Sequence, residues 1–401
     1  MFETTYNEKS PAADWTLLTA VTLLAMIGIA FVHSATSVQD QYRNLPWYSQ
    51  FAFKQGIWFI LGLGLSASFC LVDYRVWARY SLVYYWLMIL LLVAVLVFGS
   101  RINGARRWID FPLMRIQPSE FAKLAFIFAQ AHFLSRPTDE LRQVGIFWRG
   151  IGLTILPFAL ILKEPDLGSS LVLLPVGLVM MFTAGVPLVF LRRLVGGAAL
   201  LVSLIVVDVV FAPLNWQLVK LENYQKQRLL VYFNRDFAEP DASPEERRQA
   251  AARQFNLSYN VRQALISVGS GGLWGKGWCE NDQVRLGFLP RMGVHNDFIF
   301  SVIAEEKGFL GSVSVLALYT VVLFAGLRTA SQARDRLGKL LAVGVVTLLF
   351  SHVFINIGMN IRIMPVTGIP LPLLSYGGSS VLCSLIAVGL MQNIHIHRRG
   401  Y

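Results

Sequence analysis

Long runs of apolar residues are the feature that most constrains the fold of this chain. Ten of them are long enough, or nearly so, to cross a bilayer as a helix, which takes about 20 residues at a rise of about 1.5 Å each. They cover residues 15–34, 56–72, 80–99, 118–135, 147–162, 167–185, 191–211, 298–326, 339–360 and 371–394. Because a chain in lipid must satisfy its own backbone hydrogen bonds, the runs predict an all-α, polytopic membrane protein, a bundle of about ten transmembrane helices.

Composition supports a membrane protein and excludes an ordinary soluble domain. Of the 401 residues, 55% are hydrophobic and 15% are charged, whereas the apolar share of soluble domains is about 45–50%. The first apolar run is expected to be an uncleaved anchor, because no basic segment precedes it and no small-residue cleavage site follows. The three cysteines have neither metal-ligand spacing nor a disulfide framework, so no metal site is predicted. We expect residues 1–401 to form a single transmembrane domain.

The distribution of Lys and Arg predicts the orientation in the membrane. Basic residues of the short loops are more numerous on the side that holds both termini, and such loops stay in the cytoplasm. Both termini are therefore expected to be cytoplasmic, and the polar insertion at 212–297, between the seventh and eighth predicted helices, to be one long extracytoplasmic loop. Within it, residues 225–233 have the pattern of an amphipathic surface helix. The charged, proline-containing stretch 239–248 is expected to lack a fixed structure.

Two ionisable residues, His295 and Asp297, stand where the long loop re-enters an apolar run. A carboxylate at a membrane boundary is costly unless it is paired or hydrated, so its presence there indicates a functional site. A carboxylate within reach of a hydroxyl group can act as a general base. The alternative is that Asp297 only caps the following helix.

A second polar segment on the predicted outer face, 101–110, carries three arginines and Trp108. These arginines run against the positive-inside trend and therefore need a partner. A guanidinium group matches phosphate oxygens with two parallel hydrogen bonds, so a lipid pyrophosphate is a candidate. Pairing with lipid headgroups, or with acids of the long loop, is the alternative.

Polar residues also lie at the N-terminal ends of the fourth and sixth predicted helices. Pro118 suits the first turn of a helix, which places Glu120 and Lys123 three residues apart on one face. A salt bridge that satisfies only this pair is the alternative to a substrate contact. Pro165 breaks the apolar run before Asp166, and capping of the next helix is the simpler role for that aspartate.

Glycines and small polar residues mark two further candidate segments. The stretch 269–277 includes Lys276, but Ser270 stands where a nucleotide-binding phosphate loop requires glycine, so a nucleotide site is not supported. Ser375 follows an irregular link at 365–372. Non-helical backbone at membrane depth is tolerated only inside protein or beside a wet cavity, so a cavity open to the outside is predicted.

Together these segments resemble the SEDS family of polytopic cell-wall polymerases, the group of RodA, FtsW and SpoVE. The matching segments run in order along nearly the whole chain. They are residues 104–109, 117–123, 164–168, 269–277, 295–300, 305–308 and 365–380. Residues 227–234, 275–278 and 288–290 resemble the RodA branch more than FtsW. The chain departs from the family pattern at Arg291, Asn296 and Arg362, whereas Asp297 matches it.

The resemblance implies an inverting peptidoglycan glycosyltransferase that polymerises lipid II into β-1,4-linked glycan strands and releases undecaprenyl pyrophosphate. The context that it implies is cell elongation and maintenance of rod shape. Asp297 matches the family's essential acid and would act as the catalytic base. Arg106 and Lys123 would balance the charge of the pyrophosphate. The other substrate-binding candidates are Trp108, Glu120, Asp166, Lys276, His295 and Ser375.

Three alternatives stay open at this point. A lipid II flippase should need polar groups at the bilayer midplane and access from both sides, whereas the ionisable residues here cluster at the outer mouth. A division polymerase of the FtsW type is the second alternative. The third is a non-catalytic scaffold of the elongation complex, which predicts that replacing Asp297 with Ala leaves growth unchanged.

The resemblance also implies partners and a location. The partners are lipid II, a class B penicillin-binding protein acting as transpeptidase, and membrane proteins of the elongation complex, with no nucleic acid. The location is the bacterial cytoplasmic (inner) membrane, crossed several times, with the active site on the outer face. No cofactor is implied, and whether a divalent cation (Mg²⁺ or Mn²⁺) assists the pyrophosphate stays open.

Overall fold

A bundle of long helices makes up most of the protein. The computed structural model describes residues 13–39, 42, 46–102, 105–110, 115–211, 223–233, 243–289 and 293–398. Arg291 and the parts of the predicted long loop at 212–222 and 234–242 lie outside the described residues.

Ten helices correspond one to one to the ten apolar runs, so the predicted all-α membrane fold is confirmed. They are α1 (Trp15–Ser37), α3 (Phe51–Leu71), α5 (Ser81–Phe98), α6 (Pro118–Leu134), α8 (Val144–Lys163), α9 (Leu167–Ala184), α10 (Leu188–Phe211), α14 (Ile299–Gln332), α15 (Arg336–Asn360) and α16 (Gly378–Ile396). In the described part of the chain, nine of these are long and apolar enough to cross a membrane. The remaining one, α6, has 17 residues and is buried along most of its length among α5, α8, α9 and α15.

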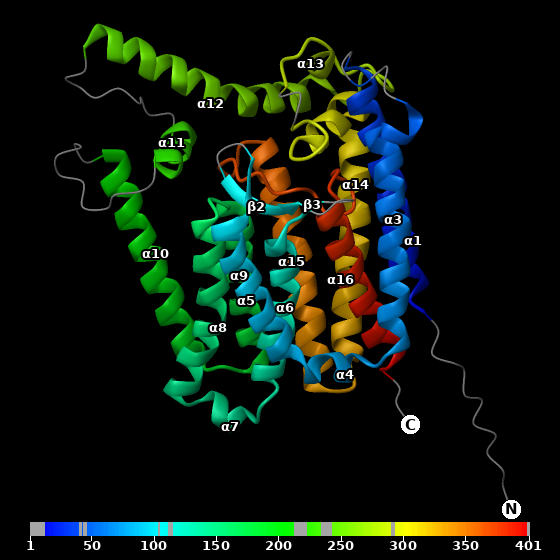
Figure 1. Cartoon of the computed structure of the whole chain (residues 1–401), viewed down its shortest axis with the longest axis vertical. Coiled ribbons are helices and arrows are strands. Elements are labelled where there is room, and N and C mark those ends of the chain that lie inside the picture. Colours follow the sequence, from blue (N-terminus) through cyan, green and yellow to red (C-terminus); the bar gives the residue numbers. More distant parts are fainter. Residues whose placement is uncertain are drawn as a thin grey trace, which may run out of the picture.

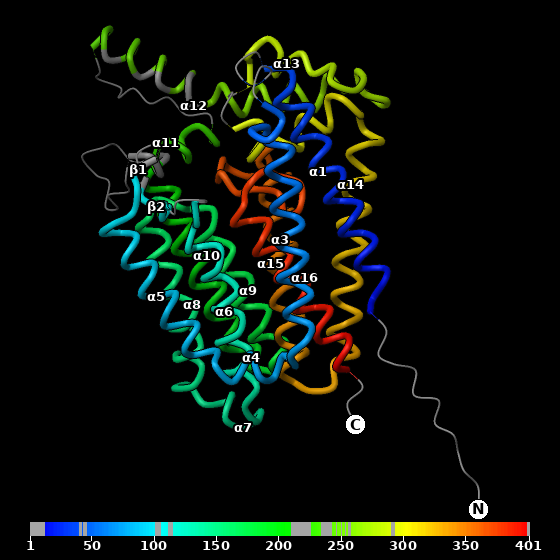
Figure 2. Tube along the Cα trace, turned by 45° about the vertical axis from the view of Figure 1, so that its right-hand side comes forward, coloured from blue at the N-terminus to red at the C-terminus, as the bar shows by residue number. Residues whose placement is uncertain are grey.

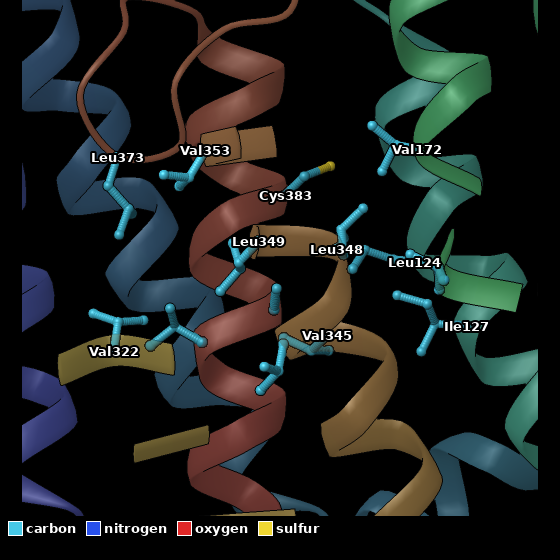
Figure 3. Packing of buried hydrophobic residues seen from close by; sticks show 14 of the residues in the cluster. Leu124, Ile127, Val172, Val322, Val345, Leu348, Leu349, Val353, Leu373 and Cys383 are labelled. Carbon is cyan, nitrogen blue, oxygen red and sulfur yellow. The ribbon is translucent and has the colours of Figure 1, made fainter. Parts of the chain in front are cut away.

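The core of the bundle lies around α15 and α16, which are buried over 89% of their apolar spans. Figure 3 shows how side chains of neighbouring helices meet there, with Leu348 of α15 facing Leu124 and Ile127 of α6. On the other side of the core, α3 packs along α16, and α1 packs along α14 (Figure 2). By contrast, α10 stands at the edge of the bundle, with 6% of its span buried (Figure 1).

A small antiparallel sheet between α5 and α6 is a feature that the sequence does not predict. Its strands β1 (Ser100–Ile102), β2 (Ala105–Asp110) and β3 (Arg115–Ile116) lie in the order β1-β2-β3. Strands this short carry no readable alternation of apolar and polar residues, so only the pairing itself reveals them. The sheet holds the arginine-rich segment at one end of the bundle.

The predicted long loop contains helices. The described parts hold α11 (Asn223–Tyr232), α12 (Pro244–Ser270) and α13 (Asp282–Arg285), and α12 runs across the end of the bundle (Figure 1). A helix at 225–233 is thus confirmed. The expectation that 239–248 lacks structure is wrong for residues 244–248, which begin α12, because their packed continuation stabilises a helix that local charge does not favour; residues 239–242 lie outside the described residues.

At the opposite end of the bundle, polar contacts tie the helix ends together. Asp14 caps α1, and its backbone N–H donates to Gln392 Oε1 of α16 at 3.0 Å. In the short helix α4 (Tyr74–Arg79), Arg75 pairs with Asp335 at 2.8 Å, and Asp335 also caps α15. The start of α1 and the end of α16 therefore lie at the same end, away from α12 (Figure 1).

Candidate functional site

Asp297 lies immediately before α14, at the end of the bundle that α12 crosses. Two amides of α15 fix its backbone, because Asn356 Nδ2 and Asn360 Nδ2 donate to its carbonyl at 3.0 and 3.1 Å. Its half-buried carboxylate, by contrast, makes no hydrogen bond with the residues that the structure describes. The link after α15 passes close by, since a Cβ at Gly368 would lie 3.5 Å from Asp297 Oδ2. The backbone of Asp297 is therefore fixed in place, while its carboxylate oxygens are not used in hydrogen bonds among the described residues.

The electrostatic surroundings of Asp297 suit a general base. Burial raises the pKa of its carboxyl to about 6, and Asp166 acts in the same direction, while Arg107 and Arg228 act against it. At neutral pH the group is then mostly ionised, yet basic enough to accept a proton.

Arg107 of β2 reaches the break between α8 and α9. Its Nε donates to the Glu164 carbonyl at 2.9 Å, and its Nη2 donates to the Pro165 carbonyl. Asp166 follows, accepting from Ser169 N at 3.1 Å as the cap of α9 and from Gln117 Nε2 at 3.0 Å. Asp166 thus caps a helix, as the simpler interpretation predicts, and also lies close enough to Asp297 to influence its pKa.

Arg106, the arginine selected from the sequence, lies elsewhere. Its Nη1 donates to the carbonyls of Leu96 and Val97, at 3.3 and 2.7 Å, at the end of α5. Neighbouring residues of a strand point to opposite faces, so β2 directs Arg107, rather than Arg106, toward Asp297. Trp108 is half-buried in the same strand, and its carbonyl accepts from Ser100 Oγ at 3.2 Å.

Glu120 and Lys123 form an ion pair inside the bundle. Lys123 Nζ lies 2.7 Å from Glu120 Oε1 and 3.0 Å from Nε2 of His352 on α15. All three side chains are buried. Sequence reasoning did not identify His352, because its partner lies 229 positions away. The Lys123 ammonium group is thus paired with Glu120 and contacts His352 inside the protein.

His295 and Ser375 support the segment that leads into Asp297. The His295 ring packs against Phe51 and Tyr376, with centroids 4.6 and 5.5 Å away, and burial lowers its pKa to about 4, so the ring is neutral. Ser375 Oγ donates to the Asn296 carbonyl at 2.5 Å and accepts from Leu371 N at 2.7 Å. A cavity of about 120 Å³ lies beside this cluster, lined by His33, Thr36, Ser37, Tyr42, Gln50 and Phe51.

Lys276 joins the loop after α12 to α14. Its Nζ lies 2.7 Å from Glu305 and 3.0 Å from Asp282. The backbone of the glycine-rich loop also fills a break in α14, where Gly308 has a φ of +64°. There Lys276 N donates to the Glu305 carbonyl, and Phe309 N donates to the Gly272 carbonyl, at 3.0 and 2.8 Å. Lys276 is therefore used in holding the loop.

The structure thus gathers Asp297, Asp166, Arg107 and Arg228 at one end of the bundle; Arg107 and Arg228 are the members that sequence reasoning missed. The signal for Arg107 was the arginine-rich segment 101–110, which does not say which arginine faces inward, and Arg228 lay in the cationic stretch 225–233. No three His, Cys, Asp or Glu residues in the described ranges are grouped so as to hold a metal ion.

Comparison with known proteins gives consistent matches along the chain. A family model for FtsW, RodA and SpoVE, described as "Cell cycle protein", matches residues 14–400. The peptidoglycan glycosyltransferase MrdB of Escherichia coli is 36% identical over 84% of each chain. The peptidoglycan glycosyltransferase RodA of Treponema pallidum is 31% identical over 95% of this chain and 97% of its own.

Two solved structures share the fold over nearly the whole chain. The crystal structure of the rod shape determining protein RodA of Thermus thermophilus has a TM-score of 0.65 at 28% identity, covering 97% of this chain and 99% of that one. A chain from a structure described as "Structural coordination of polymerization and crosslinking by a peptidoglycan synthase complex" has a TM-score of 0.74 at 28% identity, covering 96% and 98%.

Proposed function

The chain belongs to the FtsW, RodA and SpoVE (SEDS) family of peptidoglycan glycosyltransferases, and we propose that it polymerises lipid II into β-1,4-linked strands with Asp297 as the catalytic base. The observation that carries this proposal is the placement of Asp297. Its backbone is held by two asparagines, its carboxylate makes no hydrogen bond with the described residues, and its pKa is raised to about 6.

The reaction needs two things that this site can supply. Asp297 accepts the proton of the attacking sugar hydroxyl, and inversion at the anomeric carbon then needs no covalent enzyme intermediate. Arg107 and Arg228 supply positive charge for the undecaprenyl pyrophosphate that leaves. Asp166 holds the start of α9 in place beside them. We assign no role in binding the pyrophosphate to Lys123, whose ammonium group is already paired.

The enzyme works in the bacterial cytoplasmic membrane in this proposal, with both termini inside and the Asp297 end outside. Residues 1–401 form one functional unit, with 212–297 as its extracytoplasmic segment. Similarity to MrdB and RodA favours a role in cell elongation. Since one structural relative comes from a complex that couples polymerisation to crosslinking, we also propose a transpeptidase partner, a class B penicillin-binding protein.

Polymerisation of labelled lipid II by the purified full-length protein with its co-expressed transpeptidase partner tests this function. Wild type should form glycan strands, and Asp297→Asn should reduce the rate by at least about 10²-fold, because it removes the general base. Asp110→Asn is the matched control, since Asp110 is an exposed aspartate at the end of β2 and should retain wild-type activity. All three proteins must elute as folded monodisperse complexes. Full activity of Asp297→Asn would refute the assignment.

A further inference from the structure

Glu164 is a buried carboxyl group that the mechanism above does not use. It lies between the end of α8 and Pro165 and is 0% exposed. Neither of its carboxyl oxygens has a hydrogen-bond partner in the part of the chain that the structure describes. Asp166, two residues later, differs in this respect, because both of its oxygens accept hydrogen bonds.

A carboxyl group in such a place is stable only in its neutral form. Transfer of a charged carboxylate away from water is costly unless hydrogen bonds or an ion pair compensate it, and otherwise the group binds a proton. Burial raises the pKa of Glu164 to about 8, with Asp166 acting in the same direction and Arg107 against it. Glu164 therefore carries its proton at neutral pH.

The charge of Glu164 matters because it shares a neighbour with Asp297. Arg107 holds the carbonyls of Glu164 and Pro165 and stabilises the charged forms of both Glu164 and Asp297. Among the residues that the structure describes, the charged groups acting on Glu164 or Asp297 come from β2 (Arg107), the start of α9 (Asp166), the segment before α14 (Asp297) and α11 (Arg228).

With Glu164 neutral, these four described groups comprise two cations and two anions. Ionised Glu164 would add a third anion and compete with Asp297, and with an incoming pyrophosphate, for the Arg107 guanidinium. It would also repel the pyrophosphate directly.

We propose that Glu164 is a positioning residue that acts in its neutral form: its proton leaves Arg107 available to Asp297 and the pyrophosphate, and loss of that proton turns the polymerase off at alkaline pH. This inference rests on the proposed function. The reaction should then have two pH limits, an acid limit set by Asp297 and an alkaline limit set by Glu164.

The test compares pH profiles of lipid II polymerisation for wild type and Glu164→Gln, each as the full chain with its transpeptidase partner. Glutamine has the size of the protonated acid and cannot ionise. Between about pH 7.5 and about pH 9.5 the wild-type rate should fall by roughly 20- to 30-fold, because the protonated fraction of a group with a pKa of about 8 falls by that factor. For Glu164→Gln the rate over the same interval should fall by less than about threefold.

The matched control is Glu140→Gln, because Glu140 lies in α7 (Thr138–Leu141), at the opposite end of the bundle. Its profile should match wild type. An alkaline limit that persists in Glu164→Gln would overturn the inference, as would loss of activity at every pH in a folded Glu164→Gln protein, which would show that the carboxyl group itself reacts or holds a cation. Absence of strands from wild type at every pH, beside an active control polymerase, would instead count against the proposed function.

A second readout does not depend on activity. Difference infrared spectroscopy of the purified protein between neutral and alkaline pH should show a protonated-carboxyl C=O band that disappears with a midpoint near pH 8 in wild type and is missing in Glu164→Gln. The same band in both proteins would mean that Glu164 does not lose a proton in this pH range, and the proposal would fall even if polymerisation could not be measured.

Discussion

At the scale of the residue, Asp297 combines a fixed backbone with an unengaged side chain. The amides of Asn356 and Asn360 hold its carbonyl, so the carboxylate need not form hydrogen bonds within the protein to stay in place. A general base benefits from this arrangement, because oxygens already satisfied by protein donors would be less basic.

The raised pKa of Asp297 predicts the acid side of the pH profile. The base acts only when ionised, so activity should fall as the pH drops through about 6, by roughly tenfold for each further pH unit. Initial rates of strand formation between about pH 4.5 and about pH 7.5 would measure this, with a thermal-stability control at each pH. A flat profile down to about pH 4.5 would show that the pKa of Asp297 is not raised, or that Asp297 is not the base.

Arg107 and Arg106 offer a comparison of neighbouring arginines in one strand. Arg107→Ala should lower kcat/KM by about 10²-fold or more, because it removes a cation beside Asp297 and the leaving group. Arg106→Ala should cost much less activity, since its guanidinium holds carbonyls at the end of α5. Steady-state kinetics of the two folded variants decide the matter, and equal losses would contradict the assignment.

At the scale of the element, α14 is a helix completed by another segment. At Gly308 its backbone leaves the helical region, and the loop at 272–277 supplies the hydrogen bonds that the break would otherwise lose. The carboxylates of Glu305 and Glu306 on the same turn are fully buried and accept from that loop and from α1. The loop after α12 is therefore expected to be stable only together with α14, the helix that follows Asp297.

Gly308→Ala should destabilise both segments. A Cβ at Gly308 would lie 2.4 Å from Gly275 N, and the φ of +64° disfavours any other residue, so a cost of roughly 1–3 kcal/mol is expected. The matched control is Gly152→Ala in α8, where nothing lies within 4 Å of the added carbon. Thermal unfolding in detergent would compare the two variants. An unchanged Tm for Gly308→Ala would contradict the close packing of the loop at 272–277 into the break in α14.

At the scale of the whole molecule, the two ends of the bundle differ in what they carry. One end holds Asp297, the charged cluster and α12, and the other holds the ends of α1 and α16 with the Arg75–Asp335 pair. This polarity fits an enzyme whose chemistry takes place on one face of the membrane.

Cysteine labelling tests which end faces outward. In a variant without the native cysteines, Glu280→Cys near α13 should react with a membrane-impermeant maleimide in intact cells, because that end is proposed to be extracytoplasmic. Asp139→Cys in α7 should react only after permeabilisation. Both positions are exposed. The reverse pattern would invert the proposed orientation.

The sequence by itself determined the membrane fold, the ten helices and the position of the acid before α14. These follow from local properties: apolar length decides whether a segment crosses lipid, and proline or aspartate at the start of a run decides where a helix begins. Thus α6 begins at Pro118 and α9 follows Asp166, as the sequence indicates.

Only the tertiary structure decided which side chains meet. The choice of Arg107 over Arg106 depends on the pleat of a strand that is too short to recognise in the sequence. The contact between Lys123 and His352 depends on the packing of helices that are far apart in the chain. The neutral state of Glu164 likewise depends on which donors are absent around it among the described residues. Side-chain pairing and burial arise from distant segments brought together, which local pattern does not encode.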